Sequence, residues 1–266
     1  MNRAALNALD QVVSLARSRA KSRVPIVGVA GPQGSGKTTL VSAFAASHPK
    51  VAHFSLDDVY LSKTQRQALA RDRHPLFVTR GPPGTHAMAL FDGTVTALEG
   101  SGMNAQTPIP VFDKASDDRL PQSRWPVFEG RPSLILVDGW CLGATPQSEK
   151  DIAAPINKLE MEEDSEGAWR RAINQFLEGY QSSFAMFDAI LCLRAPLFNI
   201  VLDWRCQQEE GLLGYSLSAV ERDRIARFIA HYERLTLSMM AGRRRADIEI
   251  QLDRQRNVVE IRRLSA

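Results

Sequence analysis

The sequence of 266 residues predicts one α/β domain in which a doubly wound, mostly parallel sheet carries a phosphate-binding loop after its first strand. Three observations favour this fold class. Short apolar runs rich in β-branched residues alternate with segments of helical periodicity, as in a parallel sheet covered by helices. A glycine-rich motif lies between the first run and a helical segment. The composition, 44% hydrophobic and 24% charged, is that of an ordinary globular protein.

Charge and cysteine content exclude several function classes. The 33 basic and 30 acidic residues give a net charge of +3, so binding to nucleic acid is not indicated. No apolar run approaches the roughly 20 residues that span a bilayer, so we expect no membrane association. Cys141, Cys192 and Cys206 lack a C-x-x-C spacing, which favours a reducing compartment over a disulfide or zinc framework.

The first segment, residues 1–23, shares the basic character of an organellar transit peptide. Its apolar residues Leu6, Leu9 and Ala16 instead follow helical spacing, which favours an ordinary leading helix. We therefore expect a cytoplasmic protein, with import into an organelle as the less favoured alternative.

The remaining elements follow from local patterns. Apolar runs predict parallel strands at residues 24–30, 51–55, 133–137 and 189–193. Helices are expected at residues 38–47, from Pro196 onward, and after Ser218, where Glu221 completes a capping box. The inner face of the helix from Pro196 is expected to comprise Leu197, Ile200, Val201 and Trp204. Residues 247–252 and 258–261 predict a closing hairpin.

One stretch interrupts this alternation. Residues 75–132 hold eight of the 14 prolines and six of the 17 glycines, with one clear helical pattern near 86–99. Loops of this length in a compact domain are usually functional or disordered. Since proline fixes backbone angles, we expect an inserted substrate-binding region, and an interdomain linker is the alternative.

The phosphate-loop motif is the strongest functional signal. Gly31 to Thr38 reads GPQGSGKT, which fits G-x-x-x-x-G-K-[ST] between a strand and a helix. Backbone N–H groups of such a loop bind phosphate, Lys37 is expected at the β- and γ-phosphates, and Thr38 at Mg²⁺. Asp138, after the third strand, is the second expected metal ligand, or else a cap. The residues expected to bind ATP are Gly31, Pro32, Gln33, Gly34, Ser35, Gly36, Lys37, Thr38 and Thr39.

Other users of such a loop fit less well. A GTPase needs an N-K-x-D motif that recognises guanine. The nearest string, NKLE at residues 157–160, ends in Glu and follows no apolar strand. A motor or helicase needs more length or a basic face. A small-molecule kinase therefore remains.

Residues 55–60 (SLDDVY) carry a first resemblance. The sequence resembles the P-loop kinases of the uridine kinase, pantothenate kinase and phosphoribulokinase group, which carry S-x-D-x-F/Y there. The resemblance implies that Asp57 activates the acceptor hydroxyl, with Tyr60 beside it at the substrate. Asp58 is either a second acceptor of substrate hydroxyls or a helix N-cap.

Further strings are closer to one family. RGPPGTH (80–86), PVFDKA (110–115), DDR (117–119), DGWCLG (138–143) and DWRCQQE (203–209) resemble the D-glycerate 3-kinases of plants and fungi and their bacterial relatives, over residues 25–262. This implies ATP- and Mg²⁺-dependent phosphorylation of a small hydroxy acid. The substrate contacts implied are Arg80, His86, Lys114, Arg119 and Trp140, and residues 194–215 correspond to a lid whose Arg205 would neutralise transition-state charge.

Several of these residues also have an explanation that involves no substrate or nucleotide. Lys114 and Arg119 are otherwise solvated loop charges, His86 a helix cap and Arg205 part of a solvated face. The sequence also departs from the family pattern at Ala87, Phe112 and Ala115, where the family commonly has polar groups. These departures weaken the assignment of glycerate as acceptor.

We therefore expect a kinase that transfers the γ-phosphoryl group of ATP to a small, anionic, D-glycerate-like metabolite, with Lys37, Asp57 and Arg205 as its catalytic residues. The alternatives are a nucleoside, pantothenate or sugar-phosphate kinase of the same group, or a nucleotide-binding regulatory ATPase. Either a monomer or a homodimer is compatible with the sequence.

Overall fold

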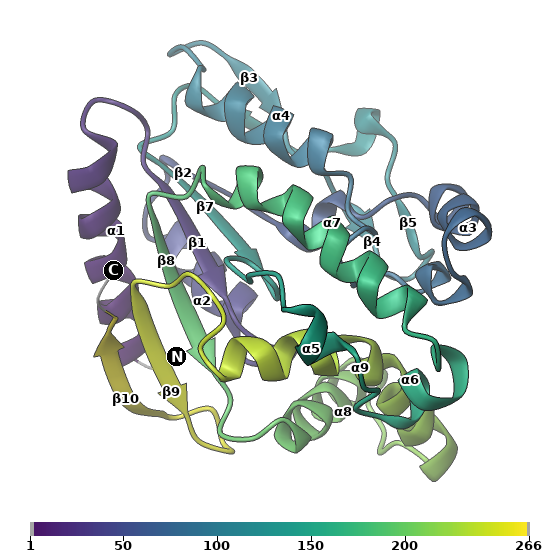
Figure 1. Cartoon of the computed structure of the whole chain (residues 1–266). Coiled ribbons are helices and arrows are strands. Elements are labelled where there is room, and N and C mark those ends of the chain that lie inside the picture. Colours follow the sequence, from purple (N-terminus) through teal and green to yellow (C-terminus); the bar gives the residue numbers. More distant parts are fainter. Residues whose placement is uncertain (1–2, 265–266) are drawn as a thin grey trace.

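A computed structural model describes residues 3–264 and shows a central sheet covered by helices on both faces (Figure 1). Within these residues the sheet has six strands in the order β10-β9-β8-β1-β7-β2, all neighbours parallel except the final β9-β10 hairpin. The strands are β1 (Ile26–Ala30), β2 (Val51–Ser55), β7 (Leu134–Gly139), β8 (Ala189–Arg194), β9 (Ile248–Leu252) and β10 (Val258–Arg263). The doubly wound, mostly parallel fold class is thus confirmed.

The helices follow the strands in the alternation that the sequence predicts. They are α1 (Arg3–Ala20), α2 (Lys37–Ala46), α3 (Lys63–Asp72), α4 (Met88–Glu99), α5 (Glu149–Ile152), α6 (Lys158–Glu163), α7 (Ala168–Phe184), α8 (Asn199–Leu213) and α9 (Ala219–Met240). Within residues 3–264, none of them combines the length and hydrophobicity that a membrane span requires. The Ser218–Glu221 capping box forms as expected at the start of α9.

Two cores hold the helices to the sheet. Alternate residues of β1 point to opposite faces, so Val27 and Val29 pack with α1, α2 and α8, whereas Ile26 and Ala30 pack with α4, α7 and α9. Figure 1 shows α1 on one side of the sheet and α4, α7 and α9 on the other. The three cysteines are buried and form no disulfide.

The proline- and glycine-rich region 75–132 is more ordered than its pattern predicts. Besides α4 it contains β3 (Gln106–Pro108) paired with β6 (Val127–Glu129), and β4 (Phe112–Asp113) paired with β5 (Asp118–Arg119). The described residues also include the 3₁₀ turns η1 (Leu56–Val59), η2 (Pro75–Val78) and η3 (Gln122–Arg124). Phe91, Val95 and Leu98 of α4 join the main core, so this region packs on the sheet.

One expected helix starts later than predicted. The helix expected from Pro196 begins at Asn199, and Leu197, expected on its inner face, is 54% exposed. The peptide N–H of Ile200 bonds to the Leu197 carbonyl, so residues 195–198 form a turn that leads into the helix. Ile200, Val201 and Trp204 are buried as expected.

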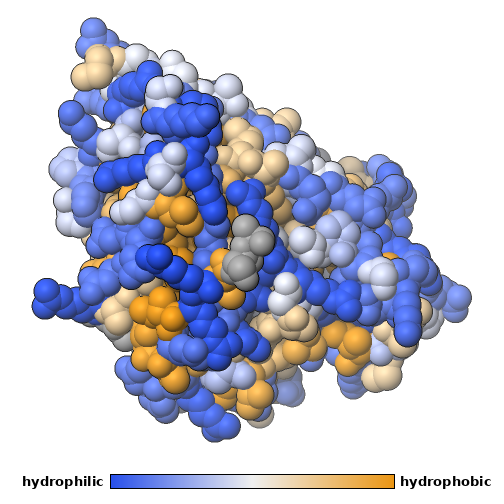
Figure 2. Space-filling view, turned by 60° about the vertical axis from the view of Figure 1, so that its left-hand side comes forward, coloured by the Kyte–Doolittle hydropathy of each residue, from blue (hydrophilic) through white to orange (hydrophobic). Residues whose placement is uncertain are grey.

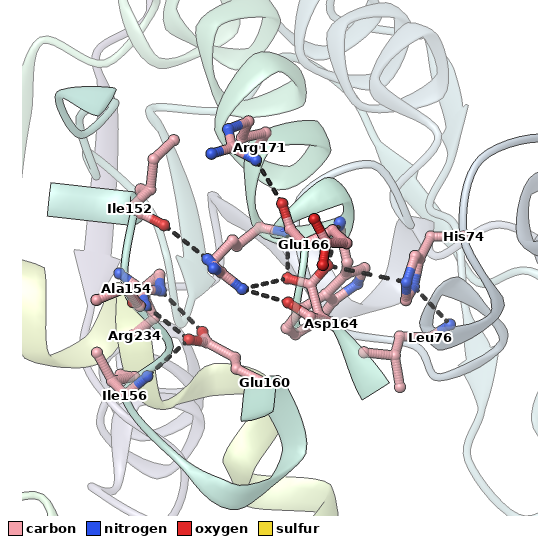
Figure 3. A network of polar contacts seen from close by, with 12 residues as sticks. His74, Leu76, Ile152, Ala154, Ile156, Glu160, Asp164, Glu166, Arg171 and Arg234 are labelled. Carbon is pink, nitrogen blue, oxygen red and sulfur yellow. Dashed lines mark hydrogen bonds and ion pairs between the residues drawn. The ribbon is translucent and has the colours of Figure 1, made fainter. Parts of the chain in front are cut away.

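A buried network of charged groups joins α5–α7 to α9 (Figure 3). We call Glu160, Asp164, Arg170 and Arg234 the arginine clamp. Arg170 contacts Asp164 at 3.0 Å and donates to the carbonyls of residues 152 and 153, while Arg234 pairs with Glu160 at 2.6 Å. The clamp fixes the position of α9, which forms one wall of the site below.

The outer face turned toward the viewer in Figure 2 is largely hydrophilic, and its hydrophobic residues form smaller separate groups. This agrees with the 24% of residues that are charged.

Candidate active site

The phosphate loop connects β1 to α2 at the carboxyl edge of the sheet, where open α/β folds bind their ligands. Gly34 lies in the loop with φ 72°, a conformation that favours glycine. A Cβ atom at this position would also come within 2.7 Å of the Trp204 Cβ. Glycine is therefore required both for the turn and for the close approach of α8.

Lys37, the first residue of α2, folds back over this loop. Its Nζ donates to the Pro32 carbonyl at 2.9 Å. Burial lowers the pKa of Lys37, and the carboxylates of Asp138 and Asp57 partly oppose this shift. The ammonium group is thus held beside the loop amides with few partners of its own, as a phosphate ligand should be.

Two oxygen-bearing side chains meet next to the loop. The Thr38 hydroxyl donates to Asp138 Oδ2 at 3.0 Å, and Ser55 Oγ lies 3.3 Å from the same oxygen. Asp138 is only 3% exposed, and its pKa is raised by burial against the opposing effect of Lys37. Mg²⁺ prefers oxygen ligands and commonly takes one or two from the protein, so Thr38 and Asp138 fit this ion.

Asp57 follows β2 in the turn η1, across the edge of the sheet from Asp138. Its carboxylate accepts a hydrogen bond from the Tyr60 hydroxyl at 2.9 Å and an ion pair from Lys114 at 3.1 Å. Burial alone would raise the pKa of Asp57, but Lys114, Tyr60 and Lys37 outweigh it and the net shift is downward. Asp57 is therefore an ionised hydrogen-bond acceptor at neutral pH.

These groups open onto one cavity of about 470 Å³. Its lining residues come from the phosphate loop, η1, region 75–132, β7, α8 and α9. They include Gln33, Gly34, Lys37, Thr38, Asp57, Tyr60, Arg80, Lys114, Ala115, Asp138, Trp140, Arg205, Gln208, Glu209, Leu212, Phe228 and Tyr232. The structure thus brings together most of the site residues expected from the sequence.

Arg80 is fixed at the wall of this cavity before any ligand binds. Its guanidinium pairs with Asp117 and lies 5.7 Å from the ring centre of Phe112 and 6.0 Å from that of Phe228. The Tyr232 hydroxyl donates to the Arg80 carbonyl at 2.8 Å. Such a preorganised cation is suited to an anionic ligand.

Helix α8 covers the opposite side. Arg205 pairs with Glu209 at 2.8 Å, and Leu212, at the same face of the helix, is 76% exposed although it lines the cavity. Gln208, Glu209 and Leu212 were missed by the sequence analysis. Their spacing of three, four and seven residues from Arg205 is the helical signal that would have found them.

Three residues expected at the substrate, Asp58, His86 and Arg119, lie outside the lining of this cavity. Asp58 accepts the Ser55 peptide N–H at 2.8 Å in a capping box, and burial raises its pKa to about 6. His86 is 5% exposed and contacts the Tyr180 hydroxyl at 3.0 Å, so it caps no helix either. Arg119 lies in β5, where it pairs with β4.

The three departures from the family pattern have different consequences. Ala115 lines the cavity, so a polar side chain is missing from the wall at this point. Phe112 is 5% exposed and its ring supports the guanidinium groups of Arg66 and Arg80. Ala87 contributes a backbone hydrogen bond to Val59 and does not line the cavity.

A second cavity of about 430 Å³ lies on the other side of the phosphate loop. It shares Gly34, Lys37, Thr38 and Gln208 with the first cavity. Its further lining residues are Ala5, Ser35, Gly36, Thr39, Leu40, Leu193, Leu252, Arg256 and Val258. The loop therefore separates two spaces, only one of which contains Asp57.

Comparisons with known proteins identify kinases of similar sequence and fold. The chain is 31% identical over 261 residues to the chloroplastic D-glycerate 3-kinase of Arabidopsis thaliana, covering 88% of this chain and about half, 54%, of that relative. It is 29% identical to an uncharacterized kinase of Schizosaccharomyces pombe, with 84% of each chain covered. The structure matches D-glycerate 3-kinase from Cryptococcus neoformans with a TM-score of 0.77 at 22% identity, covering 98% of both chains. No protein-family model matches the chain.

Proposed function

Because the chain is a D-glycerate 3-kinase-like P-loop kinase, we propose that it transfers the γ-phosphoryl group of ATP to a hydroxyl of a small, anionic, D-glycerate-like metabolite. One observation carries the proposal. An ionised carboxylate, Asp57, opens onto the same cavity as Lys37, Thr38 and Asp138, with Arg80 and Lys114 on its wall.

The chain's own groups account for phosphate binding. The amides of residues 34–38 and the N-terminus of α2 provide hydrogen-bond donors and positive potential, and Lys37 adds a full charge. Thr38 and Asp138 would hold Mg²⁺, which when bound neutralises phosphate charge. Arg205 lies across the cavity in α8, and we assign residues 194–215 as the lid.

Asp57 supplies the acid–base chemistry. Its lowered pKa keeps it ionised, so it can accept a hydrogen bond from the acceptor hydroxyl and take its proton as the new P–O bond forms. Lys114 now occupies one oxygen of Asp57, whereas Tyr60 bonds the other. An acceptor carboxylate that draws Lys114 away would free this oxygen for the hydroxyl.

The acceptor is expected to be anionic because two cations, Arg80 and Lys114, line the cavity and each pairs with one carboxylate. Arg80 is held in place by Asp117 and two aromatic rings. Lys114 is 61% exposed, and an exposed ion pair such as Lys114–Asp57 costs little free energy to break. Both belong to region 75–132, which we assign as the substrate-binding region of a single kinase domain. The nucleoside of ATP would then lie in the second cavity.

The decisive experiment is a panel of acceptors with ATP and Mg²⁺, followed by ADP release. We expect D-glycerate or a related hydroxy acid to give the highest kcat/KM, and Asp57→Asn to lower kcat by about 10² to 10⁴-fold. Affinity for MgADP should stay within about twofold, because Asp57 faces the acceptor and not the nucleotide. The exposed Asp72→Asn variant serves as the control.

Other outcomes separate the alternatives. Preference for a nucleoside, pantothenate or a sugar phosphate would assign the chain to another substrate within the same kinase group. ADP release that is independent of every acceptor would favour a regulatory ATPase. Unchanged kcat in Asp57→Asn would contradict the role of Asp57.

A further inference from the structure

The phosphate loop is tied to the lid helix by an arginine far away in the sequence. Arg256 lies in the turn between β9 and β10, and its Nε donates to the Gly34 carbonyl at 2.6 Å. The same guanidinium donates to Gln207 Oε1 at 3.0 Å and to the Trp204 carbonyl at 3.4 Å. One side chain thus bonds both the loop and α8.

The turn that presents Arg256 is itself rigid. The Asp253 carboxylate accepts the peptide N–H groups of Gln255 and Asn257 at 2.8 and 2.7 Å. Arg256 has φ 66°, an uncommon conformation for a residue with a side chain. Trp204 Nε1 also donates to the Arg254 carbonyl at 2.8 Å, so α8 is anchored to the turn as well.

Aromatic contact completes this arrangement. The Arg256 guanidinium lies 5.1 Å from the ring centre of Trp204, which is fully buried. Trp204 in turn packs so closely on Gly34 that no side chain fits there. The loop, the turn and α8 therefore meet at one point.

The orientation of the loop follows from peptide geometry. The Gly34 carbonyl and the Ser35 N–H belong to one planar trans peptide and point in opposite directions. The hydrogen bond that holds the Gly34 carbonyl toward Arg256 therefore also fixes the direction of the Ser35 N–H, on the opposite side of the peptide. Arg256 also lines the second cavity, where we propose that the nucleoside binds. It does not line the cavity that contains Asp57 and that would hold the acceptor.

We propose that Arg256 is a positioning residue for the nucleotide. It holds the phosphate-loop amides and the lid helix in the arrangement that binds the phosphates of ATP or ADP. This inference rests on the proposed kinase function, but it concerns nucleotide affinity, which can be measured without any acceptor.

Titration calorimetry with MgADP tests the proposal. Arg256→Ala should weaken MgADP binding about tenfold or more, since it removes charge-assisted hydrogen bonds to the loop and to α8. Arg256→Lys should recover part of the affinity, because one donor can still reach the Gly34 carbonyl. Arg254→Ala, an exposed arginine of the same turn, should bind like the wild type.

Steady-state kinetics provide the second readout. We expect KM for ATP to rise in Arg256→Ala while KM for the acceptor stays within about twofold. Gln207→Ala removes one of the two hydrogen bonds from Arg256 to α8 and leaves the bond to the Gly34 carbonyl in place. It should give a smaller loss of MgADP affinity in the same direction, and it guards against misfolding of the Arg256 variants.

Two results would overturn the inference. The first is unchanged MgADP affinity in folded Arg256→Ala, even if its melting temperature falls, because the role would then be structural only. The second is an equal rise of KM for both substrates. Failure of the wild type to bind MgADP would instead remove the proposed function, and this inference with it.

Discussion

The arginine clamp and the candidate active site both contain clustered charges, but their charges are satisfied to very different degrees. In the clamp, Arg170 donates to two backbone carbonyls and to both the carboxylate and the carbonyl of Asp164. Asp164 also accepts the peptide N–H groups of Trp169 and Arg170. Figure 3 shows how these contacts gather in one place.

The active site leaves its charges with fewer partners. Among residues 3–264, the Lys37 ammonium group makes one hydrogen bond, to the Pro32 carbonyl. Burial lowers the pKa of Lys37. Burial likewise raises the pKa of Asp138, whose carboxylate meets only hydroxyl donors from Thr38 and Ser55. The comparison indicates that charged groups with a full set of hydrogen-bond partners stabilise the fold. Buried charged groups with few partners are instead typical of ligand-binding sites.

The largest expected effect lies in the undersaturated region. Lys37→Ala should lower kcat/KM by about 10³-fold or more, because it removes the full charge at the phosphates. The melting temperature of the free protein should not fall, since the buried ammonium is poorly compensated. Activity and thermal melting are measured together, with the exposed Lys50→Ala as control.

A folded Lys37→Ala variant with wild-type kcat/KM would contradict the assignment of the phosphate site. A large fall in its melting temperature would contradict the comparison itself, because Lys37 would then stabilise the fold in the way that the clamp does.

The clamp should give the opposite result. Arg170→Met leaves the buried Asp164 carboxylate without its cation, so we expect a loss of about 3–5 kcal/mol in the free energy of unfolding. The folded fraction should keep its kcat/KM within about threefold, because the clamp does not line the cavity. Chemical denaturation and assays below the transition measure both quantities.

The neighbouring residue provides a matched control. Arg171 pairs with Glu149 at 2.6 Å, but both side chains are exposed to solvent, 44% and 64%. Exposed pairs typically contribute about 0–1 kcal/mol, so Arg171→Met should have little effect. Equal losses of stability in Arg170→Met and Arg171→Met would show that burial of an ion pair does not determine its contribution to the free energy of unfolding.

The same contrast explains how much of the molecule could be predicted from its sequence. Lys37, Thr38, Asp57 and Asp138 each lie in a short motif or directly after a strand, and the ends of parallel strands meet at one edge of the sheet. Local patterns therefore predicted four side chains that line one cavity, and their roles at the phosphate, metal and acceptor stay predictions.

Contacts between distant segments left no such local signal. The Arg256–Gly34 bond joins residues 222 positions apart. Asp117, in the turn between β4 and β5, meets Arg80 only because the chain folds back over 37 residues. Tyr232 of α9 is buried and also lines the cavity, and helical periodicity does not distinguish a core position from one at the edge of a cavity.

The smallest effect at neutral pH is expected at His86, which is buried near the site yet uncharged. The Tyr180 hydroxyl accepts the Gly84 N–H at 2.8 Å and lies 3.0 Å from His86 Nδ1. Burial lowers the pKa of His86 to about 4, whereas the unfolded chain has an ordinary value of about 6.5. At neutral pH both states are therefore uncharged and the free energy of unfolding is unaffected.

Below pH 6.5 the unfolded state binds a proton that the folded state does not, so the folded protein loses stability until the pH approaches 4. This loss should amount to roughly 3 kcal/mol and be absent in His86→Gln. Urea denaturation at a series of pH values measures the difference, with His53→Gln as the exposed control. If the wild type and His86→Gln show the same pH dependence, His86 carries a charge that its surroundings compensate, and it resembles the clamp more than the site.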